Sequence, residues 1–171
     1  MTTTETLVMI RNVYGSILIS VAAQFSHRPE VLAGIMMRES AGGLSLTPPG
    51  TAGTGDNGHG RGLMQIDDRS FPTLCAGDRW KDPAENIAAA AADLRGQRAQ
   101  VQSECRKFAV PATLDQIERM AIAAYNCGAD LAVHALRHGE DIDRYTTGGD
   151  YSAAVLAFAE QYRTLDAGIT G

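Results

Sequence analysis

Apolar residues recur every three or four positions over much of the chain, which is the period of an amphipathic α-helix. Thr4, together with Glu5 or Thr6, is expected to cap the first helix of this kind. Its apolar stripe consists of Leu7, Ile10, Tyr14, Ile17, Val21 and Phe25. The N-terminal segment therefore predicts a helix that packs on a core.

Further segments carry the same period or the residues that begin a helix. Pro29 suits a first helical turn, and the apolar face that follows it ends near Ser40. Thr113 with Gln116 resembles a capping box. The predicted helices run from Pro29 to about Ser40, from Pro83 through Val101, from Thr113 through Ala124, from Ala129 to Leu136, and from Asp150 or Ser152 through Tyr162.

The exception is the segment from Ala41 to Arg61, which is rich in glycine and contains Pro48-Pro49. This composition excludes a helix, so short hairpin strands and an irregular loop are the alternatives. Leu63 to Ile66 is expected to form a short strand. A long glycine-rich segment in a helical domain is more often functional than a linker when polar groups lie at both its ends. Those groups are the carboxylates of Glu39, Asp56, Asp67 and Asp68.

The composition agrees with this picture. A chain of 171 residues, 44% of them hydrophobic and 20% charged, suits one globular domain over residues 1–171. Abundant alanine and an aromatic content of 6% favour closely packed helices over a β-sandwich. The formal net charge of −5 argues against a nucleic-acid partner, because phosphates require many basic residues.

The cysteines are Cys75, Cys105 and Cys127, and their odd number excludes a fully paired disulfide framework within one chain. Their spacing fits no zinc motif. Small buried apolar residues are the favoured interpretation. A single disulfide, for example Cys75–Cys105, is the alternative, and no local signature supports a catalytic thiol.

The N-terminal segment permits a second interpretation. Val13 to Ala23, preceded by Arg11, is apolar enough to imitate the central region of a signal peptide. It is too short and too often interrupted by polar residues for a membrane span. The amphipathic stripe favours a structural helix, and we then expect no secretion signal within this chain and no membrane contact.

Two features near the glycine-rich segment could carry chemistry. Glu39 ends an otherwise apolar helix turn, and a carboxyl group half-buried there stays protonated more readily and suits a general acid. In Gly60 to Asp67, the glycines beside Arg61 permit close approach to a ligand, and Gln65 points away from its apolar neighbours if this is a strand. Taken singly, a solvated helix end and a polar turn before a core strand are the favoured interpretations of these features.

A third feature is Tyr125-Asn126, which follows a run of small residues and precedes Gly128. Tyr125 could stack on a sugar ring and Asn126 could hydrogen-bond to it, although a core tyrosine and a helix C-cap are the simpler interpretation. A fourth is Tyr145 to Tyr151, a turn followed by a helix start.

Together these features resemble goose-type lysozymes, in the wider group that includes soluble lytic transglycosylases. The order and spacing match that family from about residue 5 to residue 163. The resemblance implies a mainly α, lysozyme-like α+β fold, in which a helical bundle surrounds a central helix and a small glycine-rich β-hairpin flanks the active-site cleft. The matching motifs are Arg38-Glu39-Ser40-Ala41-Gly42, Gly62-Leu63-Met64-Gln65-Ile66-Asp67, Ala124-Tyr125-Asn126-Cys127-Gly128 and Thr146-Thr147-Gly148-Gly149-Asp150-Tyr151.

The resemblance also implies an activity, the cleavage of the β-1,4 bond between N-acetylmuramic acid and N-acetylglucosamine in peptidoglycan. Glu39 matches the general acid of the family, and Asp56 and Asp67 match two aspartates that position the attacking water. No cofactor and no metal is implied. The positions that match the lining of the sugar cleft are Ser40, Gln65, Tyr125, Asn126 and Tyr151.

The chain departs from the family pattern in places. Phe71 stands where members often have histidine, Cys127 replaces a small residue, and the segment from Glu39 to Asp56 is a few residues longer than in vertebrate members. These differences affect which substrates the edges of the cleft prefer more than they affect the reaction that the resemblance implies.

Two reactions are possible at such a site, and they differ in the group that attacks the sugar. An inverting hydrolase holds a water between carboxyl groups roughly 6.5–9.5 Å apart. A lytic transglycosylase uses the 6-hydroxyl of its substrate and needs no second carboxylate. The presence of both Asp56 and Asp67 favours hydrolysis with inversion. A transglycosylase that forms 1,6-anhydro products and a non-catalytic peptidoglycan-binding protein are the alternatives.

A metal-dependent reaction has little support in the sequence. His134 and His138 lie four residues apart on a predicted helix but have no third ligand nearby, and a solvated or capping role is favoured. Asp141-Ile142-Asp143 lacks the spacing of a calcium loop.

We expect a monomer that binds bacterial peptidoglycan, with a proteinaceous lysozyme inhibitor or an immunity protein as a further partner. Because the wall lies outside the cytoplasm, a chain without a cleaved signal peptide must reach it by another route. A phage endolysin fits best, and an exported bacterial effector comes second. The number of cysteines and the negative charge disfavour a secreted animal enzyme, and this charge opposes approach to anionic walls at low salt.

Overall fold

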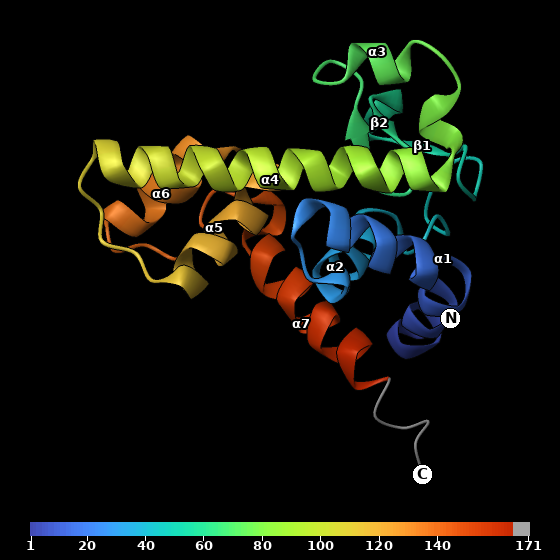
Figure 1. Cartoon of the computed structure of the whole chain (residues 1–171), viewed down its shortest axis with the longest axis horizontal. Coiled ribbons are helices and arrows are strands. Elements are labelled where there is room, and N and C mark those ends of the chain that lie inside the picture. Colours follow the sequence, from blue (N-terminus) through green and yellow to red (C-terminus); the bar gives the residue numbers. More distant parts are fainter. Residues whose placement is uncertain (166–171) are drawn as a thin grey trace. The chain divides into compact units, whose positions relative to one another are not determined.

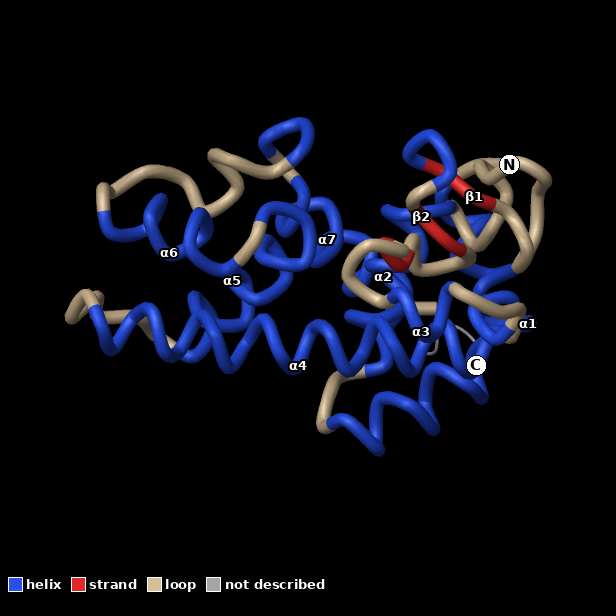
Figure 2. Tube along the Cα trace, turned by 90° about the horizontal axis from the view of Figure 1, so that it is seen from above, coloured by secondary structure: helices blue, strands red, loops and turns tan. Residues whose placement is uncertain are grey.

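The computed structural model describes residues 1–165, which form seven α-helices and three short strands (Figure 1). Helices make up most of the chain, and the strands are confined to one small region among loops (Figure 2). The predicted mainly α architecture is confirmed. The chain divides into two compact units: unit 1 contains Met1–Ala91 and the residues from Leu156 onward, and unit 2 contains Ala92–Val155.

Unit 1 begins with helix α1, Thr3–Phe25. Its N-cap is Thr2, whose side chain pairs with Glu5 in a capping box, so the predicted cap at Thr4 is wrong by two positions. Leu18, rather than Ile17, continues the buried stripe. The other apolar residues of that stripe are Leu7, Ile10, Tyr14 and Val21.

By length and composition alone, α1 could cross a membrane, since it has 23 residues and a mean hydropathy of 1.5 over its most apolar window. Within the fold, 44% of that window is buried. The helix contacts α2, Pro29–Ser40, inside unit 1. Within the described structure the segment is therefore a helix that packs on its neighbour, as the apolar stripe predicts.

Helix α2 begins with Pro29 in its first turn, as predicted, and its apolar face is buried. It ends where Ala41 adopts a left-handed conformation with φ of 49°. The last two residues of the helix are Glu39 and Ser40, so the fold places Glu39 directly before the glycine-rich segment. The buried residues of the apolar face are Val31, Leu32, Ile35 and Met36.

The glycine-rich segment contains turns and a small antiparallel sheet in the order β1-β2-β3. Strands β1 (Thr54–Gly55) and β2 (Gly60–Arg61) flank the 3-10 turn η1 (Asp56–Gly58), and β3 is Ile66–Asp67. Both alternatives for this region are therefore correct in part: residues 41–53 form turns, and residues 54–61 form a short hairpin. The register pairs Gly55 with Gly60 and Gly60 with Asp67.

The predicted strand from Leu63 to Ile66 is wrong, because residues 62–65 form a turn and Gln65 has a positive φ of 50°. The buried side chain of Asn86 accounts for the turn. Its Oδ1 accepts a hydrogen bond from the Met64 N–H at 2.9 Å, and its Nδ2 donates to the Arg61 carbonyl at 3.0 Å. These bonds take up backbone groups that a strand ladder would otherwise use.

The rest of unit 1 consists of α3 (Pro72–Cys75), the 3-10 turn η2 (Arg79–Lys81), the first part of α4 and the last part of α7. Helix α4, Pro83–Lys107, begins at the proline predicted to open it.

Unit 2 contains the remainder of α4 with α5 (Leu114–Cys127), α6 (Ala129–Arg137), the 3-10 turn η3 (Thr147–Gly149) and the start of α7 (Tyr151–Thr164). The capping box of Thr113 and Gln116 is present, as predicted. Helices α5 and α6 contact each other, and small side chains permit this close packing. The core includes Val101, Met120, Ala123, Ala132, Val133 and Ile142.

Candidate active site

The predicted site residues occur in both units. Unit 1 carries Glu39 and Ser40 at the end of α2, together with Asp56, Gln65 and Asp67 around the small sheet. Unit 2 carries Tyr125 and Asn126 at the end of α5 and Tyr151 at the start of α7.

Glu39 is half-buried, whereas the neighbouring Ser40 is completely buried. The Ser40 hydroxyl donates a hydrogen bond to the Leu63 carbonyl at 2.6 Å and accepts one from the Gly43 N–H at 3.0 Å. Ser40 therefore ties the end of α2 to the turn at residues 62–65. Its burial and its hydrogen bonds do not fit the expected direct contact with a sugar, and they indicate that Ser40 fixes the backbone beside Glu39 instead.

Asp67 ends β3, and both of its carboxylate oxygens accept hydrogen bonds from the turn that follows. Oδ1 lies 2.8 Å from Arg69 Nε and 3.2 Å from the Arg69 backbone nitrogen, and Oδ2 lies 3.1 Å from Ser70 Oγ. Partial burial raises the pKa of Asp67, but the hydrogen bonds from Arg69 and Ser70 outweigh burial and bring the pKa below its usual value. Asp67 is therefore a firmly held carboxylate at neutral pH.

Asp56 opens the 3-10 turn η1 with a positive φ of 46°. Its side chain is 67% exposed, and its Oδ2 lies 3.7 Å from Arg69 Nη2. The guanidinium of Arg69 thus contacts both aspartates that were predicted to position water. We did not predict a role for Arg69 from the sequence, although its spacing of two residues from Asp67 is a local signal for an ion pair.

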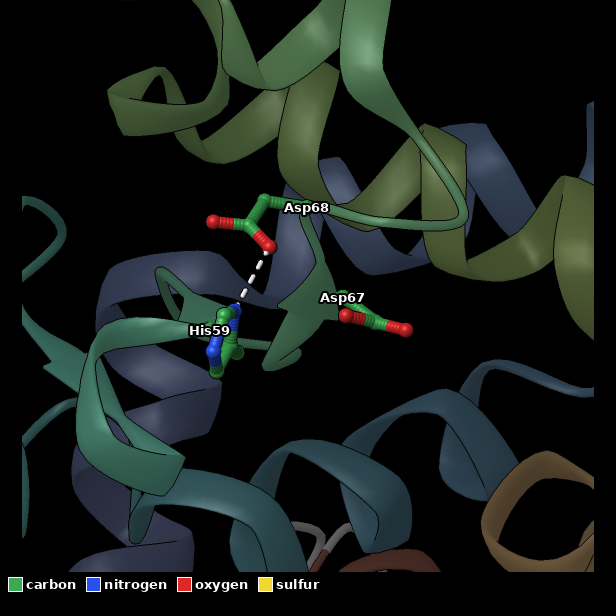
Figure 3. Close-up of side chains that lie close together, drawn as sticks. All are labelled: His59, Asp67 and Asp68. Carbon is green, nitrogen blue, oxygen red and sulfur yellow. Dashed lines mark hydrogen bonds and ion pairs between the residues drawn. The ribbon is translucent and has the colours of Figure 1, made fainter.

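Asp68 serves a different set of partners. Its carboxylate accepts hydrogen bonds from His59 Nδ1 at 3.0 Å and from Arg61 Nη2 at 2.9 Å, and these bonds lower the pKa of Asp68. Figure 3 shows the Asp68 carboxylate turned toward the His59 ring and the Asp67 carboxylate pointing away from it. The two aspartates therefore have different hydrogen-bond partners, although their carboxylates lie close together.

His59, Asp67 and Asp68 also form a group whose potential ligand atoms lie within 4.8 Å of one another in the described part of the chain. Arg61 and Arg69 already pair with the two carboxylates. The positive charges of these two guanidinium groups, each in contact with one of the carboxylates, oppose the binding of a cation. The donor set therefore does not fit a metal centre.

Gln65 lies against the glycines of the small sheet. A Cβ atom at Gly55 or Gly60 would overlap the side-chain oxygen of Gln65, and one at Gly62 would lie 2.6 Å from Asn86 Nδ2. The amide of Gln65 donates to the Gly62 carbonyl at 2.8 Å. The space beside these glycines is therefore filled by the side chains of Gln65 and Asn86 and not by a ligand. Half-buried Gln65 is held in place over the sheet.

The site residues of unit 2 differ in exposure. Asn126 is exposed and Tyr125 is half-buried, while Tyr151 is only 2% exposed. The side-chain oxygen of Asn126 accepts a hydrogen bond from the Thr147 N–H at 2.7 Å, which fixes the loop before α7. The Tyr151 N–H donates to Thr146 Oγ at 3.2 Å. Asn126 and Tyr125 are thus accessible to a ligand, whereas Tyr151 anchors a helix start.

Asp143 organises this loop, and we did not predict that role from the sequence. Its buried carboxylate accepts hydrogen bonds from the N–H and Oγ of Ser152, both at 2.7 Å, from the Ala153 N–H at 3.0 Å, and from Arg119 Nη2 at 3.2 Å. Burial raises the pKa of Asp143, but these hydrogen bonds outweigh it and bring the pKa below its usual value. Asp143 caps the N-terminus of α7, where a carboxylate is favourable.

His134 and His138 are exposed, and their rings lie in edge contact with centroids 4.1 Å apart. His138 is the C-cap residue of α6, which agrees with the predicted capping role. Among residues 1–165, neither histidine belongs to a group that could hold a metal.

The three cysteines are free, so the alternative of a Cys75–Cys105 disulfide is wrong. Burial raises the pKa of Cys75 and of Cys105. Burial and the charges of Asp143 and Asp130 raise the pKa of Cys127 to about 11. A thiol with such a pKa is almost entirely protonated at neutral pH, which opposes a catalytic role.

Comparison with known proteins gives one family. The model of the family "Lysozyme g" matches residues 3–165, which include every predicted site residue. The chain is 31% identical over 150 residues to lysozyme g of Casuarius casuarius, covering 88% of this chain and 72% of that protein. It is 31% identical over 150 residues to lysozyme G of Dromaius novaehollandiae, covering 88% and 66%. It is 35% identical over 136 residues to lysozyme g of Cyprinus carpio, covering 80% and 65%.

Proposed function

Since this chain belongs to the goose-type lysozyme (lysozyme g) family of glycoside hydrolases, we propose that it is a muramidase acting on bacterial peptidoglycan. The bond cleaved is the β-1,4 bond between N-acetylmuramic acid and N-acetylglucosamine. The observation that carries this proposal is the pair of carboxylates, Asp56 and Asp67, that contact one guanidinium in the same unit as Glu39.

In the proposed reaction, Glu39 is the general acid. It donates its proton to the glycosidic oxygen as the bond to the anomeric carbon breaks. Its half-buried place at the end of α2, which Ser40 fixes to the neighbouring turn, supports this role. A carboxyl group with a fixed backbone can be aimed at one oxygen of the substrate.

Asp56 and Asp67 hold the attacking water on the opposite face of the sugar, which gives inversion of configuration. This arrangement favours hydrolysis over the transglycosylase reaction, which needs no second carboxylate. Analysis of the products of purified peptidoglycan decides between them: hydrolysis leaves reducing ends, whereas the transglycosylase reaction leaves 1,6-anhydro ends. Release of neither product would indicate a non-catalytic binding protein.

Gln65, Tyr125 and Asn126 are the proposed sugar contacts, because their side chains are half-buried or exposed. Ser40 and Tyr151 are proposed to support the site from within, because both are buried. The proposed target lies outside the cytoplasm, and the endolysin and exported-effector routes stay proposals. The mass of the mature natural protein tests whether its N-terminus is retained.

The variant Glu39→Gln tests the central role, because a neutral amide cannot donate the proton. We expect reducing-end release to fall by about 1,000-fold, within the usual range for loss of a general acid. Glu30→Gln is the matched control: Glu30 lies in the first turn of the same helix, with a side chain 17% exposed beside Arg28. It should retain most of its activity. Full turnover by Glu39→Gln would refute the assignment.

A further inference from the structure

We propose that Arg69 is a positioning residue that holds Asp56 and Asp67 as one unit and makes them unequal, with Asp67 orienting the water and Asp56 receiving its proton. The inference rests on the proposed function and adds a residue and a division of roles to it. It follows from how the guanidinium lies between the two carboxylates.

The contact between Arg69 and Asp67 is built into the turn after β3. Backbone N–H groups of Ser70 and Phe71 donate to the Asp67 carbonyl at 3.1 and 3.0 Å, which closes the turn. Within it, the backbone nitrogen and Nε of Arg69 both reach the same oxygen of Asp67, and Ser70 Oγ reaches the other. Both oxygens of Asp67 are therefore engaged, and its position is defined by three donors.

Asp56 is held differently. Arg69 Nη2 lies 3.7 Å from its Oδ2, a charge contact longer than a hydrogen bond, and its side chain is 67% exposed. No hydrogen bond engages this carboxylate within the described chain, so its oxygens can accept a proton from water. In the attack step, the water oxygen bonds to the anomeric carbon, one water proton passes to Asp56, and the glycosidic oxygen leaves with the proton of Glu39.

The charged side chains around the small sheet support the role of Arg69 as the cation shared by Asp56 and Asp67. The carboxylates of Asp56, Asp67 and Asp68 all favour its charged form, with Asp67 contributing most. Asp68 is paired instead with Arg61 and His59, and Figure 3 shows its carboxylate turned toward the His59 ring. This leaves Arg69 as the cation that holds Asp56 and Asp67 together, where two like charges would otherwise repel.

The test is the pH dependence of kcat/KM in Arg69→Gln and Arg69→Lys, measured as reducing-end release from purified peptidoglycan. Asp67 can orient the water only as a carboxylate, and loss of the guanidinium raises its pKa, so the acid limb should move up by about one pH unit in Arg69→Gln. Arg69→Lys keeps the charge but loses the forked geometry, and should give a smaller shift. Arg163→Gln is the matched control, because Arg163 makes an equally short exposed pair with Glu160, at 2.7 Å in helix α7. It should leave the profile unchanged.

Titration of the Asp67 carboxyl by 13C NMR gives a readout that does not depend on activity. We expect its midpoint to rise in Arg69→Gln and to stay unchanged in Arg163→Gln. A uniform fall in kcat at every pH, with the acid limb and the Asp67 midpoint unmoved, would overturn the inference. Absence of reducing ends with the wild-type protein would instead overturn the proposed hydrolysis and the Asp56 role, and the NMR midpoint would still decide whether Arg69 controls Asp67.

Discussion

Replacing Asp143 with alanine should destabilise the protein more than any change at an exposed charge. The carboxylate is buried, and the backbone and side-chain groups that donate to it lose their acceptor together. Arg119 is the exception, because it keeps a 2.7 Å pair with Asp141. Buried donors without an acceptor are costly, whereas an arginine that retains a carboxylate is not left uncompensated.

The magnitude follows from these contacts. Breaking a buried ion pair by removing one partner costs about 3–5 kcal/mol. The retained Arg119–Asp141 pair places Asp143→Ala at the lower end, at about 3 kcal/mol. For a chain of this length each kcal/mol lowers Tm by about 2–4 °C, so we expect a decrease of about 6–12 °C.

Thermal unfolding followed by circular dichroism measures this change. Asp141→Ala is the control, because its side chain is 63% exposed; losing its pair with Arg119 and the hydrogen bond that it accepts from the Asp143 N–H should together cost only about 1 kcal/mol. The difference between wild type and Asp143→Ala should also depend on pH. The folded-state pKa of Asp143 is lowered, so its contribution is complete above the unfolded-state value of about 3.9 and is lost as the pH falls through the folded-state value. A Tm decrease no larger than that of Asp141→Ala, or a difference that grows on acidification, would refute the reasoning.

The remaining predictions concern the thiols, the glycine-rich segment and the net charge. The cysteines should resist iodoacetamide at pH 8 in the folded protein and react fully in denaturant, because burial raises their pKa values; rapid labelling of the native protein would contradict this. Gly53→Ala should cost about 2 kcal/mol, because its Cβ would overlap the backbone oxygen of Pro48, whereas Gly77→Ala, whose Cβ meets nothing within 4 Å, should stay within about 0.5 kcal/mol; equal Tm values for both variants would exclude the collision. Activity on walls should rise as sodium chloride is increased from about 0.01 to 0.1 M, because screening weakens repulsion between a chain of net charge −5 and an anionic polymer; a steady fall over that range would show that attraction dominates.

The helices could be predicted from the sequence because their signals are local. The Thr113–Gln116 capping box marks the start of α5, and Pro29 and Pro83 mark the starts of α2 and α4. The predicted cap of the first helix was wrong because three consecutive threonines, Thr2 to Thr4, each offer a capping hydroxyl. Glu5 selects Thr2, since a capping box requires a spacing of three residues.

The small sheet was harder to predict because distant side chains shape it. The apolar residues from Leu63 to Ile66 suit a strand, but Asn86, more than twenty residues later, binds the backbone directly before the turn and within it. A single polar residue on a helix gives little indication of such contacts. The catalytic candidates Glu39 and Asp67 could be found from motifs, whereas the support from Arg69 depends on how the turn after β3 folds, which no motif indicates.

Several acidic side chains lie close together around β3, and their mutual repulsion explains why two arginines accompany the small sheet. Asp67 and Asp68 are neighbours in sequence, and with Asp56 they bring three carboxylates into one short segment. The carboxylates of these neighbours point in different directions, and each has its own guanidinium: Arg69 for Asp67, which it shares with Asp56, and Arg61 for Asp68. Without these cations, repulsion would favour protonation of one carboxylate and remove a group that can hold water. The arginines therefore lower the pKa values of Asp67 and Asp68 and favour their charged forms, and it follows that the role of each aspartate depends on the cation that it contacts.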